Sequence, residues 1–163
     1  MNAAPHLARL IKSAHPAASL VSIASWDWIE DYFVAGQADV FDYHAKGTGT
    51  TYPERDASVL DQALMVISDN NPDFLFVHFD QVDGAGHASG FTADNPDYVA
   101  ALETVDKHVN WLITAIGKRR DHDLENWLVL VVSDHGGKGK GHGGQSDEER
   151  NVPMIAHGEG ISN

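Results

Sequence analysis

Five side chains of the kinds that bind divalent cations lie in two short segments of the sequence. The first segment holds Asp83 and His87, four residues apart. The second is the glycine-rich stretch "SDHGGKGKGHGG", which holds Asp134, His135 and His142. Carboxylate oxygens and imidazole nitrogens suit zinc, and manganese is also possible. The glycines let the backbone turn sharply and leave space for a substrate, so the two segments together predict a metal site.

A glycine-rich surface loop is the simpler interpretation of the second segment taken alone. In such a loop Asp134 would cap a turn and the histidines would share no role. Lys138 and Lys140 could face an anion, although solvent-exposed loop lysines are the simpler interpretation. The metal site is favoured because both segments follow apolar runs and a long amphipathic stretch separates them.

Apolar runs predict the strands that would position both segments. The runs "FLFVHF" and "WLVLVV" precede the two segments and are expected to be buried on both faces. The four predicted strands lie at 18–25, 74–79, 127–132 and 152–158. Strands that alternate with helices predict an α/β fold with a mostly parallel sheet. Because sites in such sheets lie at the carboxyl ends of strands, both segments are expected at one edge of the sheet.

Periodic apolar residues predict three amphipathic helices, one before Pro16, one from Pro53 and the longest from Pro96. Residues 35–52 are expected to be irregular. The stretch "QVDGAGHASG", residues 81–90, contains three glycines and is expected to form a loop. On this interpretation Asp83 and His87 lie in a loop rather than on a regular element.

Composition and charge exclude several classes of protein. The chain has 163 residues, enough for one domain with a hydrophobic core. Its net charge of −13 disfavours binding to nucleic-acid phosphates. The absence of cysteine excludes disulfides, zinc–thiolate sites and a cysteine nucleophile. No stretch of this sequence approaches the ~18 apolar residues of a membrane span.

The two segments resemble those of the alkaline phosphatase superfamily, particularly its type I phosphodiesterase and nucleotide pyrophosphatase branch. The matching pieces are "VDGAGHASG", "VVSDHGG", "GHGG" and "VPMIAHGEGI". The resemblance implies a three-layer α/β/α domain with a mostly parallel sheet. It also implies that Asp83, His87 and His142 bind one zinc. Asp134 and His135 match the aspartate and histidine that bind the second zinc.

The resemblance further implies an activity. It predicts hydrolysis of a small-molecule phosphomonoester or phosphodiester by two Zn²⁺, or Mn²⁺, and a serine or threonine nucleophile; sulfate and phosphonate esters are also open. A non-catalytic metal-binding module of the same fold and a manganese-dependent phosphomutase are the alternatives. Members of this superfamily are often exported, so a periplasmic or extracellular location is expected by the same resemblance.

The chain departs from the family pattern at the nucleophile. Residues 1–163 are expected to form a single partial catalytic domain, incomplete at both ends, because the family's first strand and its nucleophile find no match here. Thr48, Thr50 and Thr51 are alternative nucleophiles, but their place in the chain does not match the family's nucleophile. The chain is therefore expected to bind zinc and to turn over ester substrates poorly.

Several other residues compete for roles in the predicted site. Asp80 is an alternative to Asp83 as a ligand, but the four-residue step to His87 favours Asp83. His78 is expected to be a core histidine and His157 a surface residue. Trp26 and Trp28 could line a substrate pocket or pack in the core. Structural or solvated roles are expected for Glu103, Asp106, His6, His15, His44, His108 and His122.

Overall fold

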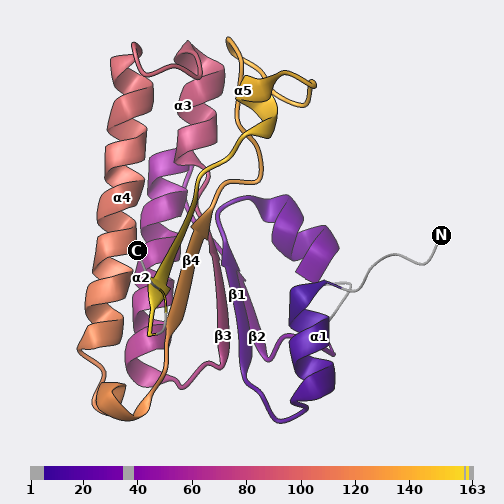
Figure 1. The fold of residues 1–163 in the computed structure, drawn as a ribbon, viewed down its shortest axis with the longest axis vertical. Helices are drawn as coiled ribbons and strands as arrows, with labels where there is room; N and C mark the ends of the chain where they lie inside the picture. The colour runs from indigo at the N-terminus through magenta and orange to yellow at the C-terminus, as the bar shows by residue number, and fades with distance from the viewer. Residues whose placement is uncertain (1–5, 35–38, 160, 162–163) are drawn as a thin grey trace, which may run out of the picture. The chain divides into compact units, whose positions relative to one another are not determined.

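Helices and strands alternate along the chain in the computed structural model (Figure 1), which describes residues 6–34, 39–159 and 161. The chain divides into two compact units, Met1–Asp80 and Gln81–Asn163. The alternation confirms the predicted α/β class. Among the described residues, no helix is both long and apolar enough to cross a membrane.

A parallel three-stranded sheet forms the centre of the N-terminal unit, with strand order β2-β1-β3. The elements of this unit are α1 Leu7–Ala14, β1 Leu20–Ala24, η1 Ile29–Val34, β2 Tyr43–Lys46, α2 Tyr52–Asp69 and β3 Phe74–His78. All five residues of β1 are buried, as the apolar, β-branched sequence of the central strand predicts. The predicted strands at 18–25 and 74–79 are confirmed. The prediction that β3 is buried on both faces is wrong, because its residues are half-buried and Phe76 is exposed.

Strand β2 lies within residues 35–52, so the prediction that this whole stretch is irregular is wrong. Its sequence "YHAK" lacks the apolar run that marks a buried strand, and its first two residues are exposed. The strand forms because β1 offers a full parallel ladder, in which Val21 pairs with Tyr43 and Ala24 with Lys46. An edge strand can be polar because one side of it faces solvent.

Helix α2 follows β2 and confirms the helix predicted from Pro53. Thr51 caps its N-terminus and Glu54 completes a capping box, which satisfies backbone N–H groups that have no partner inside the helix. The buried face includes Val59, Leu60, Ala63, Val66 and Ile67. The helix ends at Asp69, with Asn70 as its C-cap, just before "NPD".

The C-terminal unit begins with a helix where a loop was predicted. Its elements are α3 Gln81–Ser89, α4 Pro96–Gly117, η3 His122–Leu124, β4 Leu128–Val132, α5 Asp147–Arg150 and β5 Met154–Gly158. The two glycines inside α3 lower its helix propensity, which is why the sequence reads as a loop. Gly90, at φ +115, ends the helix, as glycine commonly does.

Helices α3 and α4 lie side by side in the C-terminal unit (Figure 1). Helix α4 confirms the predicted longest helix, with Asn95 as its N-cap and Pro96 in its first turn. Asn95 also donates from Nδ2 to the Gly90 carbonyl, 2.9 Å away. This bond fixes the short turn that joins the two helices.

Strands β4 and β5 form an antiparallel pair, with Val129 opposite His157 and Val132 opposite Met154. The strands predicted at 127–132 and 152–158 are therefore present. The prediction that β4 is buried on both faces is wrong, because its residues alternate between exposed and half-buried. Leu128, Leu130 and Val132 form the exposed face, which no described element covers.

Candidate metal centre

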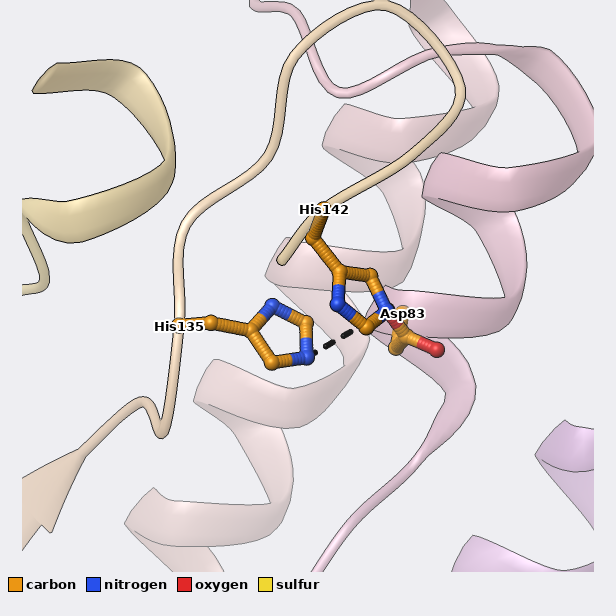
Figure 2. A group of neighbouring side chains, drawn as sticks. All are labelled: Asp83, His135 and His142. Atoms are coloured by element: carbon orange, nitrogen blue, oxygen red, sulfur yellow. Dashed lines mark ion pairs between the residues drawn. The ribbon is translucent and has the colours of Figure 1, made fainter. Parts of the chain in front are cut away.

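Asp83, His135 and His142 come together in the C-terminal unit, each offering one ligand atom within 4.8 Å of the others. Figure 2 shows the imidazoles of His135 and His142 beside each other, with the Asp83 carboxylate next to His142. Asp83 comes from the first turn of α3. Both histidines come from the glycine-rich loop that follows β4, so the two segments singled out in the sequence do meet.

His87 joins this group from the last turn of α3. A helix places residues four apart on the same face, and the His87 Nε2 atom lies 3.3 Å from Asp83 Oδ2. The same nitrogen lies 3.1 Å from His142 Nε2. The predicted spacing of Asp83 and His87 thus works through a helix, whereas the sequence suggested a loop.

Asp134 lies at the rim of the group. Its side chain is 73% exposed, and its Oδ2 atom is 3.7 Å from His135 Nε2. Its other oxygen, Oδ1, accepts the backbone N–H of His135 at 3.1 Å. Four of the five predicted ligands therefore converge and the fifth borders them. Their roles as ligands stay a prediction.

Two of the histidines have their tautomer fixed by carbonyl groups. His87 Nδ1 is 2.9 Å from the Lys140 carbonyl oxygen, and His135 Nδ1 is 2.9 Å from the Gly136 carbonyl oxygen. A carbonyl only accepts hydrogen bonds, so Nδ1 must carry the hydrogen in both rings. In the neutral rings the Nε2 atoms then carry the lone pairs, and His87 Nε2 can accept a hydrogen from His142 Nε2. Carbonyl partners of this kind commonly orient metal-binding histidines.

The donor and acceptor balance of the group fits a bound cation. Among the described residues, Asp83 Oδ1 is buried without a hydrogen-bond partner, and it faces His142 Nε2 at 3.5 Å and His135 Nε2 at 3.9 Å. A carboxylate facing imidazole lone pairs is unfavourable unless a cation or proton lies between them. Ligands of a tetrahedral zinc at its usual bond lengths lie about 3.3 Å apart, close to the separations around His87.

The glycine-rich loop is tied to its surroundings at several points. Lys138 and Gly141 bond to each other through their backbones and make a tight turn. Lys140 Nζ donates to the Ala88 carbonyl at 2.7 Å, which anchors this turn on the end of α3. Glu149 holds both ends of the loop, since its carbonyl accepts from the Gly136 N–H and its Oε1 from the Gly144 N–H. The loop is thus fixed by the chain itself.

Both loop lysines are exposed, and each also has a partner. Lys138 pairs with Glu148 at 3.6 Å, and Lys140 bonds to the Ala88 carbonyl. Both ammonium groups therefore already have partners within the chain. Burial raises the pKa of the nearby Tyr98 phenol, and the negative charge of Asp83 raises it further.

Among the described residues, the group of ligand atoms that lie within 4.8 Å of one another includes none of the competing candidates. Asp80 belongs to the N-terminal unit, where its backbone N–H donates to Asp56 Oδ1 at 2.8 Å. His78 ends β3 and is half-buried. His157 is exposed in β5, which confirms a surface position. Trp26 and Trp28 are both exposed, so core packing does not describe them.

The three candidate threonine nucleophiles lie at the start of α2. Thr48 Oγ1 is 2.9 Å from Ser58 Oγ. Thr50 Oγ1 donates to Glu54 Oε2 at 2.8 Å, and Thr51 Oγ1 accepts from the Glu54 N–H. All three hydroxyls are therefore engaged in the start of this helix.

Sequence reasoning missed two contributors to the centre. The carbonyl of Lys140 orients His87, and nothing in a residue's type marks its main chain as an orienting group. The ring of Phe91 lies against both His87 and His142. Phe91 follows Gly90, which ends α3, so helical spacing from His87 could not have predicted this contact.

Comparison with known families gives a match over most of the chain. Residues 4–140 match the profile of the family described as type I phosphodiesterase / nucleotide pyrophosphatase. A similar protein is the GPI ethanolamine phosphate transferase 2, catalytic subunit, of Homo sapiens, which is 34% identical over 106 residues. That alignment covers 64% of this chain and 10% of the human protein. The chain thus spans about a tenth of the length of this relative.

Comparison with solved structures shows a shared fold. A 2-O GAG sulfatase, BT1596, superposes with a TM-score of 0.66 at 16% sequence identity. The match covers 99% of this chain and 48% of the sulfatase chain. At this identity the likeness concerns the fold and not the substrate.

Proposed function

Because this chain belongs to the type I phosphodiesterase / nucleotide pyrophosphatase family of the alkaline phosphatase superfamily, we propose that it carries the metal-binding part of an enzyme that hydrolyses or transfers phosphate esters. The observation that supports this most directly is the convergence of Asp83, His135 and His142, with His87 in contact with two of them. These residues come from the two segments that resemble the family's metal-binding motifs.

Zinc is the proposed cation, with manganese as the alternative. Asp83, His87 and His142 would hold one ion, and Asp134 and His135 would contribute to a second. A single ion held by Asp83, His135 and His142 is the other arrangement that the geometry permits. When bound, such cations activate a hydroxyl or water and offset negative charge on the phosphate group.

The chain's own groups prepare this site for a cation. The carbonyls of Lys140 and Gly136 keep the Nδ1–H groups of His87 and His135 occupied. The Nε2 atoms are then held as lone-pair donors, at no cost of reorientation when the cation arrives. Asp83 supplies the negative charge that a divalent cation requires.

A serine or threonine nucleophile is part of the proposal, and it is not one of the three threonines near α2. The hydroxyls of Thr48, Thr50 and Thr51 are engaged at that helix start. We therefore expect this chain alone to bind metal and to turn over esters poorly. A small-molecule phosphate ester as substrate and export from the cytoplasm are further parts of the proposal, which come from the family resemblance.

Metal binding and turnover should be measured on the purified chain. Zinc affinity would be obtained by competition with a chromophoric chelator, and turnover with a chromogenic phosphodiester and a chromogenic sulfate ester. We expect saturable zinc binding that weakens in mild acid, where protons compete for the imidazoles, and little turnover. Absence of zinc and manganese binding would overturn the proposal. Robust turnover that survives alanine at Thr48, Thr50 and Thr51 would refute the nucleophile assignment.

A further inference from the structure

We infer that Phe91 is a positioning residue of the metal centre: its ring, lodged between Gly86 and Gly137, holds the imidazoles of His87 and His142 in place. The inference rests on the proposed function, since it concerns how the same centre is built. It names a side chain that no metal-binding motif includes.

One ring contacts both histidines from two different segments. The Phe91 and His87 ring centroids lie 5.5 Å apart at an interplanar angle of 81°. The Phe91 and His142 centroids lie 6.2 Å apart at 87°. Perpendicular packing of this kind is a preferred arrangement of aromatic rings. Phe91 therefore limits the rotation of an imidazole from α3 and of one from the glycine-rich loop at the same time.

Two glycines make the space for this ring. A Cβ atom at Gly86 would lie 2.2 Å from Phe91 Cε1, and one at Gly137 would lie 2.3 Å from Phe91 Cγ. Neither distance is compatible with a real side chain. Glycine is needed at these two positions because it lets the backbone approach the ring closely, and not because the backbone is left-handed there.

The position of the ring is fixed by the chain and needs no metal. The Phe91 N–H donates to the Gly139 carbonyl at 2.7 Å, which joins the end of α3 to the glycine-rich loop. Tyr98 of α4 packs against the same ring, with centroids 5.7 Å apart at 66°. The phenylalanine is thus held by its backbone and by Tyr98, and it can in turn hold the histidines.

A phenylalanine side chain has no atom that binds a metal, so it can act only through the ligands it touches. Without the ring, His87 and His142 would gain rotational freedom that metal binding must remove again. Loss of groups that orient metal ligands commonly weakens binding by about 10- to 100-fold. We expect Phe91→Leu to weaken zinc binding by about 10-fold, with the number of bound ions unchanged.

The first test compares Phe91→Leu and Phe91→Tyr with the wild-type chain. The readouts are zinc affinity by chelator competition and the visible spectrum of bound Co²⁺, which reports ligand geometry. Phe91→Tyr keeps the ring and should bind within about twofold of wild type, whereas Phe91→Leu should bind about 10-fold more weakly with an altered spectrum. Trp111→Leu, which removes an exposed ring of α4, is the matched control and should change neither readout.

The second test is a double-mutant cycle with Gly137→Ala. The added methyl should weaken zinc binding while Phe91 is present and should have little effect in the Phe91→Ala background, because the clash is then gone. Additive effects, or a Phe91→Leu chain that matches wild type in affinity and spectrum, would overturn the inference while leaving the proposed function intact. A wild-type chain that binds no metal would overturn the proposed function and this inference with it. If Phe91→Leu does not fold, Gly137→Ala in the chain that keeps Phe91 decides the question, since unchanged zinc affinity and Co²⁺ spectrum there would overturn the inference.

Discussion

Each unit of the chain contains a carboxylate in contact with histidine, and the two carboxylates differ in their partners. In the N-terminal unit, Glu30 has a fully buried side chain. Its Oε1 accepts the Ser22 hydroxyl at 2.6 Å and its Oε2 faces His44 Nδ1 at 3.1 Å. Burial raises the pKa of the Glu30 carboxyl, and the bonds to Ser22 and His44 oppose that rise. In the C-terminal unit, Asp83 Oδ1 is buried and finds no hydrogen-bond donor in the described part of the chain.

The difference shows that proximity of a carboxylate and a histidine does not make a metal site. Both oxygens of Glu30 have a donor available, so the group is complete without a ligand. Of the three imidazoles that Asp83 meets, those of His87 and His135 have their hydrogens on the other ring nitrogen, facing carbonyls. The balance of donors and acceptors, and not the residue types, separates a structural pair from a candidate cation site.

The largest effect is expected from Asp83→Asn. The change keeps the shape but removes the charge, and even loss of an orienting group costs about 10- to 100-fold in metal affinity. Loss of this ligand should therefore weaken zinc binding by about 100-fold or more. The metal-free chain should be at least as stable as wild type, because the orphaned carboxylate becomes an amide that can donate. Chelator competition and urea unfolding of the metal-free chain measure the two quantities.

Asp106→Asn is the matched control for this change, since Asp106 is exposed on α4. It should leave zinc affinity unchanged. Equal zinc affinity for Asp83→Asn and wild type would remove the contrast between the two carboxylates.

Glu30→Ala should have the opposite effect to Asp83→Asn: it should lower the stability of the chain and leave zinc affinity unchanged. It leaves the buried Ser22 hydroxyl without its acceptor, and an unsatisfied buried polar group costs about 1 to 3 kcal/mol. We expect the free energy of unfolding to fall by about 2 kcal/mol, with zinc affinity unchanged. Asp61→Ala, at an exposed position of α2, is the control for urea unfolding. A Glu30→Ala chain that keeps its stability but loses zinc would reverse the roles assigned to the two units.

The sequence predicted most of the fold where local signals were strong. Helices α2 and α4 begin at a capping residue followed by proline, and their apolar periodicity is clear. It failed for β2, whose polar sequence forms a strand only because β1 lies beside it. It also failed for α3, because helix propensity cannot anticipate that Phe91 requires a glycine at position 86.

The candidate site was predictable in its residue types and not in its construction. The four-residue step from Asp83 to His87 and the "DHGG" pattern indicated which side chains to examine. The orienting carbonyls of Gly136 and Lys140 belong to the main chain, which residue types do not describe. The slot for Phe91 depends on contacts between segments about fifty residues apart, which periodicity cannot reveal.

Gly86→Ala tests whether the Phe91 ring, which contacts His87 and His142, is held tightly by the residues packed around it. Alanine in a helix is favoured over glycine by about 1 kcal/mol, so propensity alone predicts a more stable chain. The Cβ atom would lie 2.2 Å from the Phe91 ring, and such overpacking costs about 1 to 3 kcal/mol. We expect a net loss of about 1 kcal/mol in urea unfolding. Gly117→Ala, at the end of α4 where a Cβ would meet nothing within 4 Å, should lose none, and equal results for the two would show that the ring can move aside.

The smallest effect concerns Glu54, an exposed carboxylate of the N-terminal unit that, like Glu30, accepts hydrogen bonds from nearby groups. Its Oε2 accepts from the Thr50 N–H, the Thr50 hydroxyl and the Thr51 N–H, and these bonds lower its pKa from 4.5 to about 2. The ionised form is therefore favoured by folding, so this contribution to stability is present above pH 4.5 and is lost as the pH falls toward 2. Glu54→Gln should lie below wild type in unfolding free energy at neutral pH and should meet it near pH 2. Curves for Glu54→Gln and wild type that stay parallel through this range would show that the capping bonds do not favour the charged form. The hydrogen bonds from Thr50 and Thr51 would then not explain how the N-terminal unit holds the Glu54 carboxylate.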